Sequence, residues 1–427
     1  MKYLVIILLT LLTPLVQAQS ISPAPQQSQP IIIENATIHV GNGQVIEKGV
    51  LVFQEGKITT VGTQSDDLTN AKRIDAQGKH VYPGLILPST TLGLREVDAV
   101  RATLDYREVG KFNPHVRSLI AFNTDSDIIP TIRHNGVLIA QPAPRGNMIT
   151  GTSAVVRLDA WNWEDAAIKA EDGIHLNWVS FFKFDFATFE MVKNKERDQD
   201  INALGNFFAE AQAYFNTATP STKNLKYEAM KGLFTGDKNL YIHVDYGREI
   251  VEAVQFVKKY GVKKIVVIGG RDAWMLTDFL KENDIPIILN RIHALPDHPD
   301  YDVKLPFKMP NILHKAGIKV ALNYEGDMEA MGSRNLPFIA GTAITYGLPK
   351  EEALKMVTAN TAEILGIDQM YGTLEQGKSA TLIVSDGDLF DMRTSQIVHA
   401  FIDGKEINLD NRQKQLYEKY KAKYENE

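Results

Sequence analysis

The chain contains no cysteine among its 427 residues. Disulfide bonds and thiolate metal ligands are therefore excluded, and any bound metal must be held by His, Asp or Glu side chains. The net charge of -6 is spread along the chain, so no basic stripe indicates nucleic-acid binding. Beyond the N-terminal segment, no apolar run approaches the roughly 20 residues that are needed to span a bilayer.

The N-terminal segment, MKYLVIILLTLLTPLVQAQS, has the pattern of a secretory signal peptide. Lys2 gives a positive start, Leu4 to Val16 form a short apolar stretch, and Ala18 ends a small-residue cleavage site. A membrane anchor is the alternative, but this apolar stretch is too short to span a bilayer. We therefore expect cleavage of residues 1–18 and a mature chain in the periplasm or outside the cell, with no membrane span.

Two regions of similar composition frame the chain. Residues 31–84 contain short β-branched runs separated by Gly-containing turns, and residues 369–410 return to this pattern. Because both regions predict strands, we expect them to form one composite β-sandwich. Residues 19–30 are rich in Pro, Gln and Ser and predict a disordered leader, whereas residues 411–427 predict a charged C-terminal helix or tail.

Between these regions, residues 85–368 alternate apolar strands with amphipathic helices. Strands are expected at 240–244, 264–268, 285–289 and 319–322, and helices at 198–218, 249–260, 274–282 and 336–346. This alternation predicts an α/β fold with a parallel sheet covered by helices, and the number of units fits a TIM-like (β/α)8 barrel. A doubly wound sheet is the alternative, but no Gly-x-Gly-x-x-Gly follows a predicted strand.

The segment from Pro83 to Thr91 reads PGLILPSTT and carries the most informative motif. It resembles the first barrel strand of the amidohydrolase superfamily, whose motif is Pro-Gly-Leu-Ile-Asp-x-His-x-His. Near the other end, TANTAEILGIDQMYGTLEQGKSATLIVSDGD is similar to the closing helix and returning sandwich strand of that superfamily. His243-Val244-Asp245 is similar to the His-Ala-Asp on the fifth strand of the imidazolonepropionase-like branch.

This resemblance implies metal-dependent hydrolysis of non-peptide C–N bonds, such as those of cyclic amides. The two histidines of the first strand fall on Ser89 and Thr91, and the histidine of the sixth strand falls on Gly269. His243 keeps the ligand of the fifth strand, and Glu325 replaces the aspartate of the eighth. Since neutral hydroxyl groups are weak zinc ligands, we expect a degenerate metal site and no cofactor. One zinc or manganese ion on His243 and Glu325 is the alternative.

Two hypotheses about function follow from these residues. In the first, the barrel has lost metal catalysis and is a ligand-binding or partner subunit, in a homo-oligomer or together with an active amidohydrolase paralogue. The joint replacements at Ser89, Thr91 and Gly269 favour it. In the second, the chain is a hydrolase with an atypical site that uses one metal or none. His243 and Glu325 are its catalytic residues.

Other side chains are expected around the mouth of the barrel, where a small-molecule ligand would bind. The expected pocket residues are Ser89, Thr91, Arg271, His293, Asn323 and Asp327. Arg271 is predicted to pair with Glu325 or Asp327, because two unpaired buried carboxylates would be costly. Its alternative role is to bind a carboxylate of the ligand.

Aromatic residues are concentrated between Trp161 and Phe186. They include Trp163, Trp178 and the run FFKFDF at residues 181–186. Packing of an inserted segment, or a subunit interface in which Trp and Phe are favoured, is the preferred interpretation. A shelf for a sugar or an aromatic ligand is the alternative.

Overall fold

The computed structural model describes residues 22–64, 68–217, 222–326 and 328–425. The predicted signal peptide and Asp327 lie outside these residues. Residues 22–30, which were expected to be disordered, lie instead against the folded chain. The Ala24 N–H donates to Asp159 Oδ2 at 2.8 Å, and the Gln27 side chain donates to the Phe53 carbonyl at 2.9 Å.

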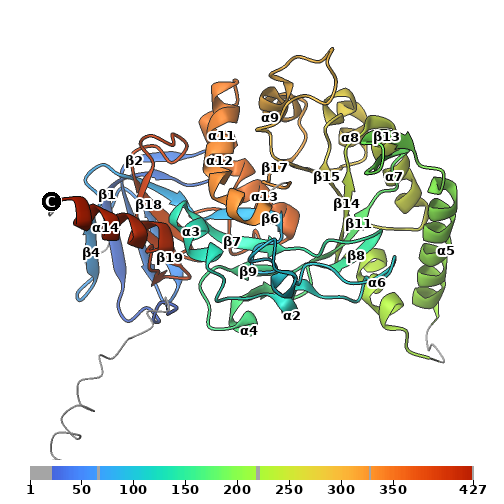
Figure 1. Cartoon of the computed structure of the whole chain (residues 1–427). Coiled ribbons are helices and arrows are strands. Elements are labelled where there is room, and N and C mark those ends of the chain that lie inside the picture. Colours follow the sequence, from blue (N-terminus) through green and yellow to red (C-terminus); the bar gives the residue numbers. More distant parts are fainter. Residues whose placement is uncertain (1–21, 65–67, 218–221, 327, 426–427) are drawn as a thin grey trace, which may run out of the picture.

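Both ends of the chain contribute to one sheet of the sandwich (Figure 1). Five of its eight strands come from the N-terminal region, beginning with β1 (Ile31–His39), β2 (Val45–Gln54), β3 (Lys57–Gly62) and β4 (Lys72–Asp75). They are followed by β5 (His80–Pro83), β18 (Leu382–Asp386), β19 (Gln396–Ile402) and β20 (Lys405–Glu406). Strand β18 pairs antiparallel with β5 and joins the two regions, with Leu382 opposite Pro83. The composite sandwich predicted from the sequence is therefore confirmed.

The TIM-like barrel is built from two further sheets. One contains β6 (Leu85–Thr90), β7 (Val137–Pro142), β9 (Val155–Arg157) and β10 (Ala167–Lys169). The other contains β8 (Ile149–Thr152), β11 (Gly173–Asn177), β14 (Asn239–Val244), β15 (Ile265–Gly269), β16 (Ile287–Leu289) and β17 (Val320–Leu322). From β11 to β17 all neighbours are parallel, whereas β8 is antiparallel to β11.

Helices cover the outside of these strands (Figure 1). They include α2 (Ser118–Ala121), α3 (Ile128–His134), α4 (Trp163–Ala166), α5 (Arg197–Asn216), α6 (Leu225–Thr235), α7 (Gly247–Lys259) and α8 (Thr277–Glu282). Further along the chain come α9 (Leu305–Lys315), α10 (Glu329–Gly332), α11 (Leu336–Thr345), α12 (Lys350–Met356) and α13 (Ala359–Leu365). The exposed α14 (Arg412–Glu425) lies beside the sandwich instead (Figure 1). Within the described residues no helix is long and apolar enough to cross a membrane.

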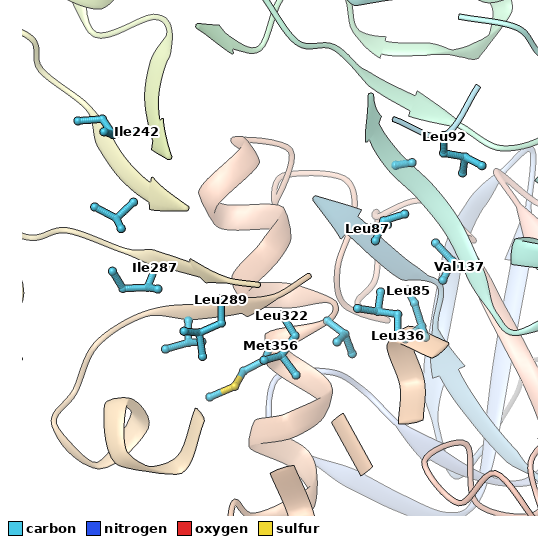
Figure 2. Packing of buried hydrophobic residues seen from close by; sticks show 14 of the residues in the cluster. Leu85, Leu87, Leu92, Val137, Ile242, Ile287, Leu289, Leu322, Leu336 and Met356 are labelled. Carbon is cyan, nitrogen blue, oxygen red and sulfur yellow. The ribbon is translucent and has the colours of Figure 1, made fainter. Parts of the chain in front are cut away.

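The barrel strands are buried on both faces, which explains their nearly continuous apolar sequences. Residues at alternate positions enter different clusters because successive side chains of a strand point to opposite sides. Ile86, Val266 and Ile288 belong to the cluster inside the barrel. Leu289 and Leu322 belong to the outer cluster, where they lie near Met356 of α12 (Figure 2). The domain boundaries at residues 84 and 368 stay predictions.

Candidate functional site

Polar side chains gather where the barrel strands end. Ser89 lies at the end of β6, His175 and His243 near the ends of β11 and β14, and Gly269 at the end of β15. Glu325 follows β17 by three residues. Because the parallel strands of a barrel present their carboxyl ends at one mouth, side chains distant in sequence meet there.

Ser89 and Thr91 act mainly through their backbone groups. The Ser89 N–H donates to the Gln141 side chain at 2.8 Å, and its carbonyl accepts from Asn323 at 3.2 Å. Ser89 has a positive φ of 42°, a backbone conformation that is uncommon for a residue with a side chain. The Thr91 N–H donates to Glu329 at 2.7 Å. Both side-chain hydroxyls are buried and have no hydrogen-bond partner among the described residues.

Arg145, from the loop after β7, lies at the centre of the polar cluster. Its guanidinium donates to Glu329 at 2.9 Å and to the Ser89 carbonyl at 3.1 Å. The Nε atom lies 3.9 Å from Glu325 Oε1. The cation therefore sits between two carboxylates, next to the strand end where the superfamily motif places two histidines. Burial disfavours the charged form of Arg145, but the negative charges of Glu329 and Glu325 outweigh this effect and raise the pKa of Arg145.

The two carboxylates respond differently to this environment. Burial favours the protonated form of Glu325, but the charge of Arg145 and then that of His243 outweigh it and lower its pKa to about 2. Burial raises the pKa of Glu329, and the negative charge of Glu325 adds to this rise. Glu325 is therefore a firmly ionised group at neutral pH, whereas Glu329 is the group of the pair that takes a proton more readily.

His243 and His175 extend the cluster away from Glu325. His243 Nδ1 lies 3.6 Å from Glu325 Oε1, and its Nε2 is hydrogen-bonded to His175 Nδ1 at 3.0 Å. His175 is fully buried. Burial, then the nearby His243 and Arg145, hold its pKa well below the usual range, so His175 is neutral at pH 7. His243 and Glu325, the two candidate ligands named from the sequence, thus lie close to each other in the structure.

Replacing Glu325 by Gln should destabilise the fold in a pH-dependent manner. A carboxyl whose pKa falls from 4.5 to about 2 on folding gives stability that is complete above pH 4.5 and is lost as the pH falls towards 2. We expect Glu325→Gln to reduce the free energy of unfolding by about 2–3 kcal/mol at pH 7. The difference from wild type should shrink at pH 3. Urea unfolding at pH 7 and pH 3 measures this difference in the free energy of unfolding. An equal loss at both pH values would contradict the lowered pKa of Glu325.

Arg271 does not pair with Glu325, and that prediction is wrong. Its guanidinium contacts Asp245 at 3.4 Å and forms a hydrogen bond with Asp297. The reason is that the strands next to β15 bring two other carboxylates closer. Arg271 follows β15, Asp245 follows the neighbouring β14, and Asp297 lies in the loop after the neighbouring β16. The part of the prediction that concerns Asp327 lies outside the described residues.

A cavity of about 320 Å³ opens beside this cluster at the ends of β15, β16 and β17. Its polar lining includes Arg271, Asn290, Arg291 and Glu325, and its apolar lining includes Ile292, Leu295, Leu305 and Met309. Arg291 lies over the Tyr324 ring, with 5.4 Å between the guanidinium carbon and the ring centroid. Asn290 Oδ1 and Glu325 Oε2 have no hydrogen-bond partner among the described residues.

The remaining predicted pocket residues lie at different places. Asn323 is fully buried beneath the mouth, where it ties β17 to the Ser89 carbonyl. His293 is absent from the cavity lining, and its Nε2 is hydrogen-bonded to Thr342 of α11 at 2.7 Å. The structure therefore brings together Ser89, Thr91, His243, Asn323 and Glu325, but leaves His293 outside. Arg271 lines the cavity but contacts Asp245 and Asp297 instead of this cluster.

Three members of the cluster, Arg145, Glu329 and His175, were not singled out as site residues from the sequence. Arg145 follows the last residue of β7 by three positions, which is the one signal that could have drawn attention to it. His175 likewise lies near a strand end. Glu329 gives no such signal, because it belongs to the short helix α10 and meets Arg145 across 184 residues of chain.

Known proteins resemble the chain over most of its length. The sequence profile of the amidohydrolase family matches residues 307–407. The imidazolonepropionase of Flavobacterium psychrophilum is 27% identical over 191 residues, 39% of this chain and 46% of that protein. The 5-methylthioadenosine/S-adenosylhomocysteine deaminase of Acetivibrio thermocellus is 25% identical over 441 residues, 92% of this chain and 97% of that protein.

Among solved structures, an amidohydrolase from Thermotoga maritima is similar with a TM-score of 0.77 and 23% sequence identity. The match covers 88% of this chain and 99% of that one. Together with the fold and the two sequence motifs, these matches show that the chain belongs to the amidohydrolase superfamily, as the sequence predicted. The relatives include both deaminases and imidazolonepropionases.

The expectation that no cofactor is needed is wrong for this class of protein. Deaminases and imidazolonepropionases normally depend on a metal, and both are among the relatives. A structural relative, an adenosine deaminase from Xanthomonas campestris, was solved with bound zinc. It has a TM-score of 0.53 and 12% identity, with 92% of this chain and 98% of that chain covered.

The residues at the strand ends nevertheless do not fit a metal site with three protein ligands. Within the described residues, no group of three or more His, Asp or Glu side chains is arranged to hold a metal. His243 and Glu325 supply two candidate ligands, but His175 Nδ1 is directed to His243, and the guanidinium of Arg145 lies against Glu325. The chemistry below therefore uses only the side chains of this chain.

Proposed function

We propose that this chain is an exported ligand-binding member of the amidohydrolase superfamily, with its binding site in the cavity at the barrel mouth. The observation that carries this proposal is the composition of the cavity wall. The lining combines the cationic Arg291 and the hydrogen-bond acceptors of Asn290 and Glu325 with the apolar side chains of Leu295 and Met309. Pockets of this size and mixed lining are typical of small-molecule sites.

The lining favours a particular class of molecule. A guanidinium binds a carboxylate with two parallel N–H donors. Asn290 and Glu325 in the lining carry amide and carboxylate oxygens that accept hydrogen bonds, so they favour a ligand with N–H or O–H donors. Leu295 and Met309 favour an apolar group. An N-acyl amino acid has a carboxylate, an amide N–H and an apolar side chain, so it satisfies all three requirements.

The charges beneath the cavity favour binding over hydrolysis. A general base works best when its pKa is near the working pH. The pKa of Glu325 is lowered to about 2 because Arg145 and His243 outweigh its burial, so it holds a proton poorly. Glu325 is therefore better suited to accept a hydrogen bond from a ligand than to take a proton from water.

Hydrolysis of a non-peptide C–N bond is the second candidate function. His243 beside Glu325 supports it, because a histidine near a carboxylate can move protons at neutral pH. The relatives, which are deaminases and imidazolonepropionases, agree with chemistry on C–N bonds. A chain with this function would release product from a bound amide, whereas a binding protein would return the ligand unchanged.

Calorimetric titration of the mature chain with N-acetyl-L-leucine tests the proposal. We expect one site, and replacing Arg291 by Ala should weaken binding by about tenfold or more because a charge-assisted hydrogen bond is lost. Arg393→Ala is the matched control, since this guanidinium is 84% exposed and pairs with Asp391 instead.

Two further comparisons separate the candidate functions. N-acetyl-L-leucinamide, which lacks the carboxylate, should bind the wild-type chain no better than N-acetyl-L-leucine binds Arg291→Ala. NMR of the titrated sample reports whether acetate and leucine appear, and their release would favour hydrolysis. Equal affinities of wild type and Arg291→Ala for the acid would contradict the proposed site.

A further inference from the structure

A two-stranded hairpin projects from the barrel between β11 and α5. Its strands are β12 (Phe182–Asp185) and β13 (Glu190–Lys193), and in the described part of the chain neither pairs with any other strand. The hairpin lies near α7, where the adjoining Phe181 N–H donates to Glu249, and far from the sandwich (Figure 1). A hairpin without a third strand is marginally stable in water. This hairpin therefore has an edge that could pair with another strand and faces that could pack against another surface.

One face of the hairpin is apolar and exposed. Phe184 lies directly opposite Met191, so both side chains are on the same face, together with that of Phe182. Phe186 and Phe189 from the turn contact the Phe184 ring edge-on, with ring centroids 5.1 and 6.1 Å away. All five side chains are exposed, from 45% for Phe184 to 80% for Phe186. A contiguous apolar surface of this kind marks an interaction site.

The outer edge of β12 carries the backbone groups of alternate residues, of which the Phe182 N–H makes a long contact of 3.4 Å with Ser180 Oγ. The Asn194 N–H donates to the Phe181 carbonyl at 2.8 Å, and Lys183 and Asp185 lie opposite Val192 and Glu190. In an antiparallel ladder, residues alternate between pointing their N–H and C=O groups to the partner strand and pointing them away. Phe181, Lys183 and Asp185 therefore face β13, whereas Phe182 and Phe184 turn their backbone groups to the outer edge.

We propose that this edge binds the same edge of a second copy of the chain. The sequence Phe182-Lys183-Phe184-Asp185-Phe186 is self-complementary in an antiparallel pairing centred on Phe184. Phe184 then faces Phe184 of the second copy, and Phe182 faces Phe186 of that copy. Lys183 faces Asp185 of the second copy on the other side of the ribbon. Opposite charges and aromatic pairs stabilise such cross-strand contacts.

The register agrees with the backbone. Phe184 turns its N–H and C=O groups outward, so the two copies of this residue can exchange both hydrogen bonds. The pairing would convert two marginal hairpins into one four-stranded sheet, in which the apolar faces run together. Lys183 now lies 3.3 Å from Glu196, in an exposed ion pair that contributes little and can be exchanged. The dimer is one form of the homo-oligomer expected from the sequence.

A single introduced cysteine tests the register, because the chain has no other thiol. In the proposed pair the two Cα atoms of residue 184 are about 5.5 Å apart, which is within disulfide range. Phe184→Cys should therefore form a covalent dimer under mild oxidation at least about tenfold faster than Phe189→Cys, whose side chain is more exposed. Non-reducing electrophoresis measures both rates, and equal rates would overturn the proposal.

Sedimentation of the full mature chain tests the charge pairing. Wild type should show a concentration-dependent dimer, and Lys183→Asp should raise its dissociation constant by about tenfold because two like-charge pairs replace two attractive ones. Lys195→Asp replaces an exposed residue outside the hairpin strands and should leave the dissociation constant of the dimer unchanged. A monomer at about 100 µM, a concentration far above a micromolar dissociation constant, would overturn the proposal, as would equal effects of the two substitutions.

Discussion

Arg145→Met should destabilise the fold by about 3–5 kcal/mol, because it leaves two buried carboxylates without their cation. The guanidinium now neutralises Glu329 at 2.9 Å and Glu325 at 3.9 Å, and it also bonds the Ser89 carbonyl. Methionine fills a similar volume but cannot replace the charge. Urea unfolding followed by circular dichroism at pH 7 measures the loss.

Two variants make this result specific to the charges. The double variant Arg145→Met/Glu329→Gln replaces one of the two unpaired carboxylates by a neutral amide. It should therefore recover part of the free energy of unfolding that Arg145→Met loses. Arg107→Met removes a neighbouring but exposed guanidinium and should change the free energy of unfolding by less than about 0.5 kcal/mol. A loss below about 1 kcal/mol for Arg145→Met would mean that the cation is not needed at the strand ends.

Asp172→Ala is expected to have the second large effect, about 3 kcal/mol, since it removes a shared hydrogen-bond acceptor from the barrel interior. The fully buried Asp172 accepts hydrogen bonds from Lys169, Tyr241 and Gln141, at distances between 2.6 and 2.7 Å. Gln141 in turn accepts the Ser89 N–H. Loss of the carboxylate therefore leaves the Tyr241 hydroxyl without an acceptor. Lys169 and Gln141 each lose one bond and keep those to the Leu365 carbonyl and Ser153 Oγ. The loop at the end of β6 is loosened through Gln141.

Asp172→Asn separates hydrogen bonding from charge. Burial raises the pKa of Asp172 although Lys169 opposes this rise, so the carboxylate is held at an energetic disadvantage. An amide keeps one acceptor oxygen for Tyr241 and Gln141 but turns an NH2 group, which cannot accept, toward the Lys169 ammonium. We therefore expect Asp172→Asn to lose less stability than Asp172→Ala, by about 1 kcal/mol. Chemical denaturation of both variants measures the contrast. Equal losses for Ala and Asn would show that the charge, not the hydrogen bonds, stabilises this region.

The regular elements could be predicted because their sequences follow local periodicity. The apolar runs at 264–268 and 319–322 correspond to β15 and β17, and the pattern at 249–260 corresponds to α7. The composite sandwich was also predictable, since two distant regions share the same strand pattern. His243 and Glu325 were found because a resemblance to a family motif placed them at strand ends.

The rest of the cluster depends on contacts that no local pattern records. Arg145 meets Glu329 across 184 residues, and Gln141 meets Ser89 across 52. The predicted pairing of Arg271 with Glu325 was wrong because charge balance alone does not show which carboxylate a loop brings near. The expectation about the cofactor was drawn from ligand identity at three positions, whereas the relatives belong to metal-dependent classes.

The zinc content of the mature chain and of Arg145→Met tests most directly whether the guanidinium supplies the positive charge at the strand ends. If it does, the variant leaves Glu325, Glu329 and His243 around the position of the lost cation. After equilibrium dialysis against zinc, Arg145→Met should then hold more zinc than wild type, by about one ion per chain, and this excess should disappear in Arg145→Met/His243→Ala. Equal zinc in wild type and Arg145→Met, lost from both when His243 is replaced by Ala, would contradict the central role given to Arg145.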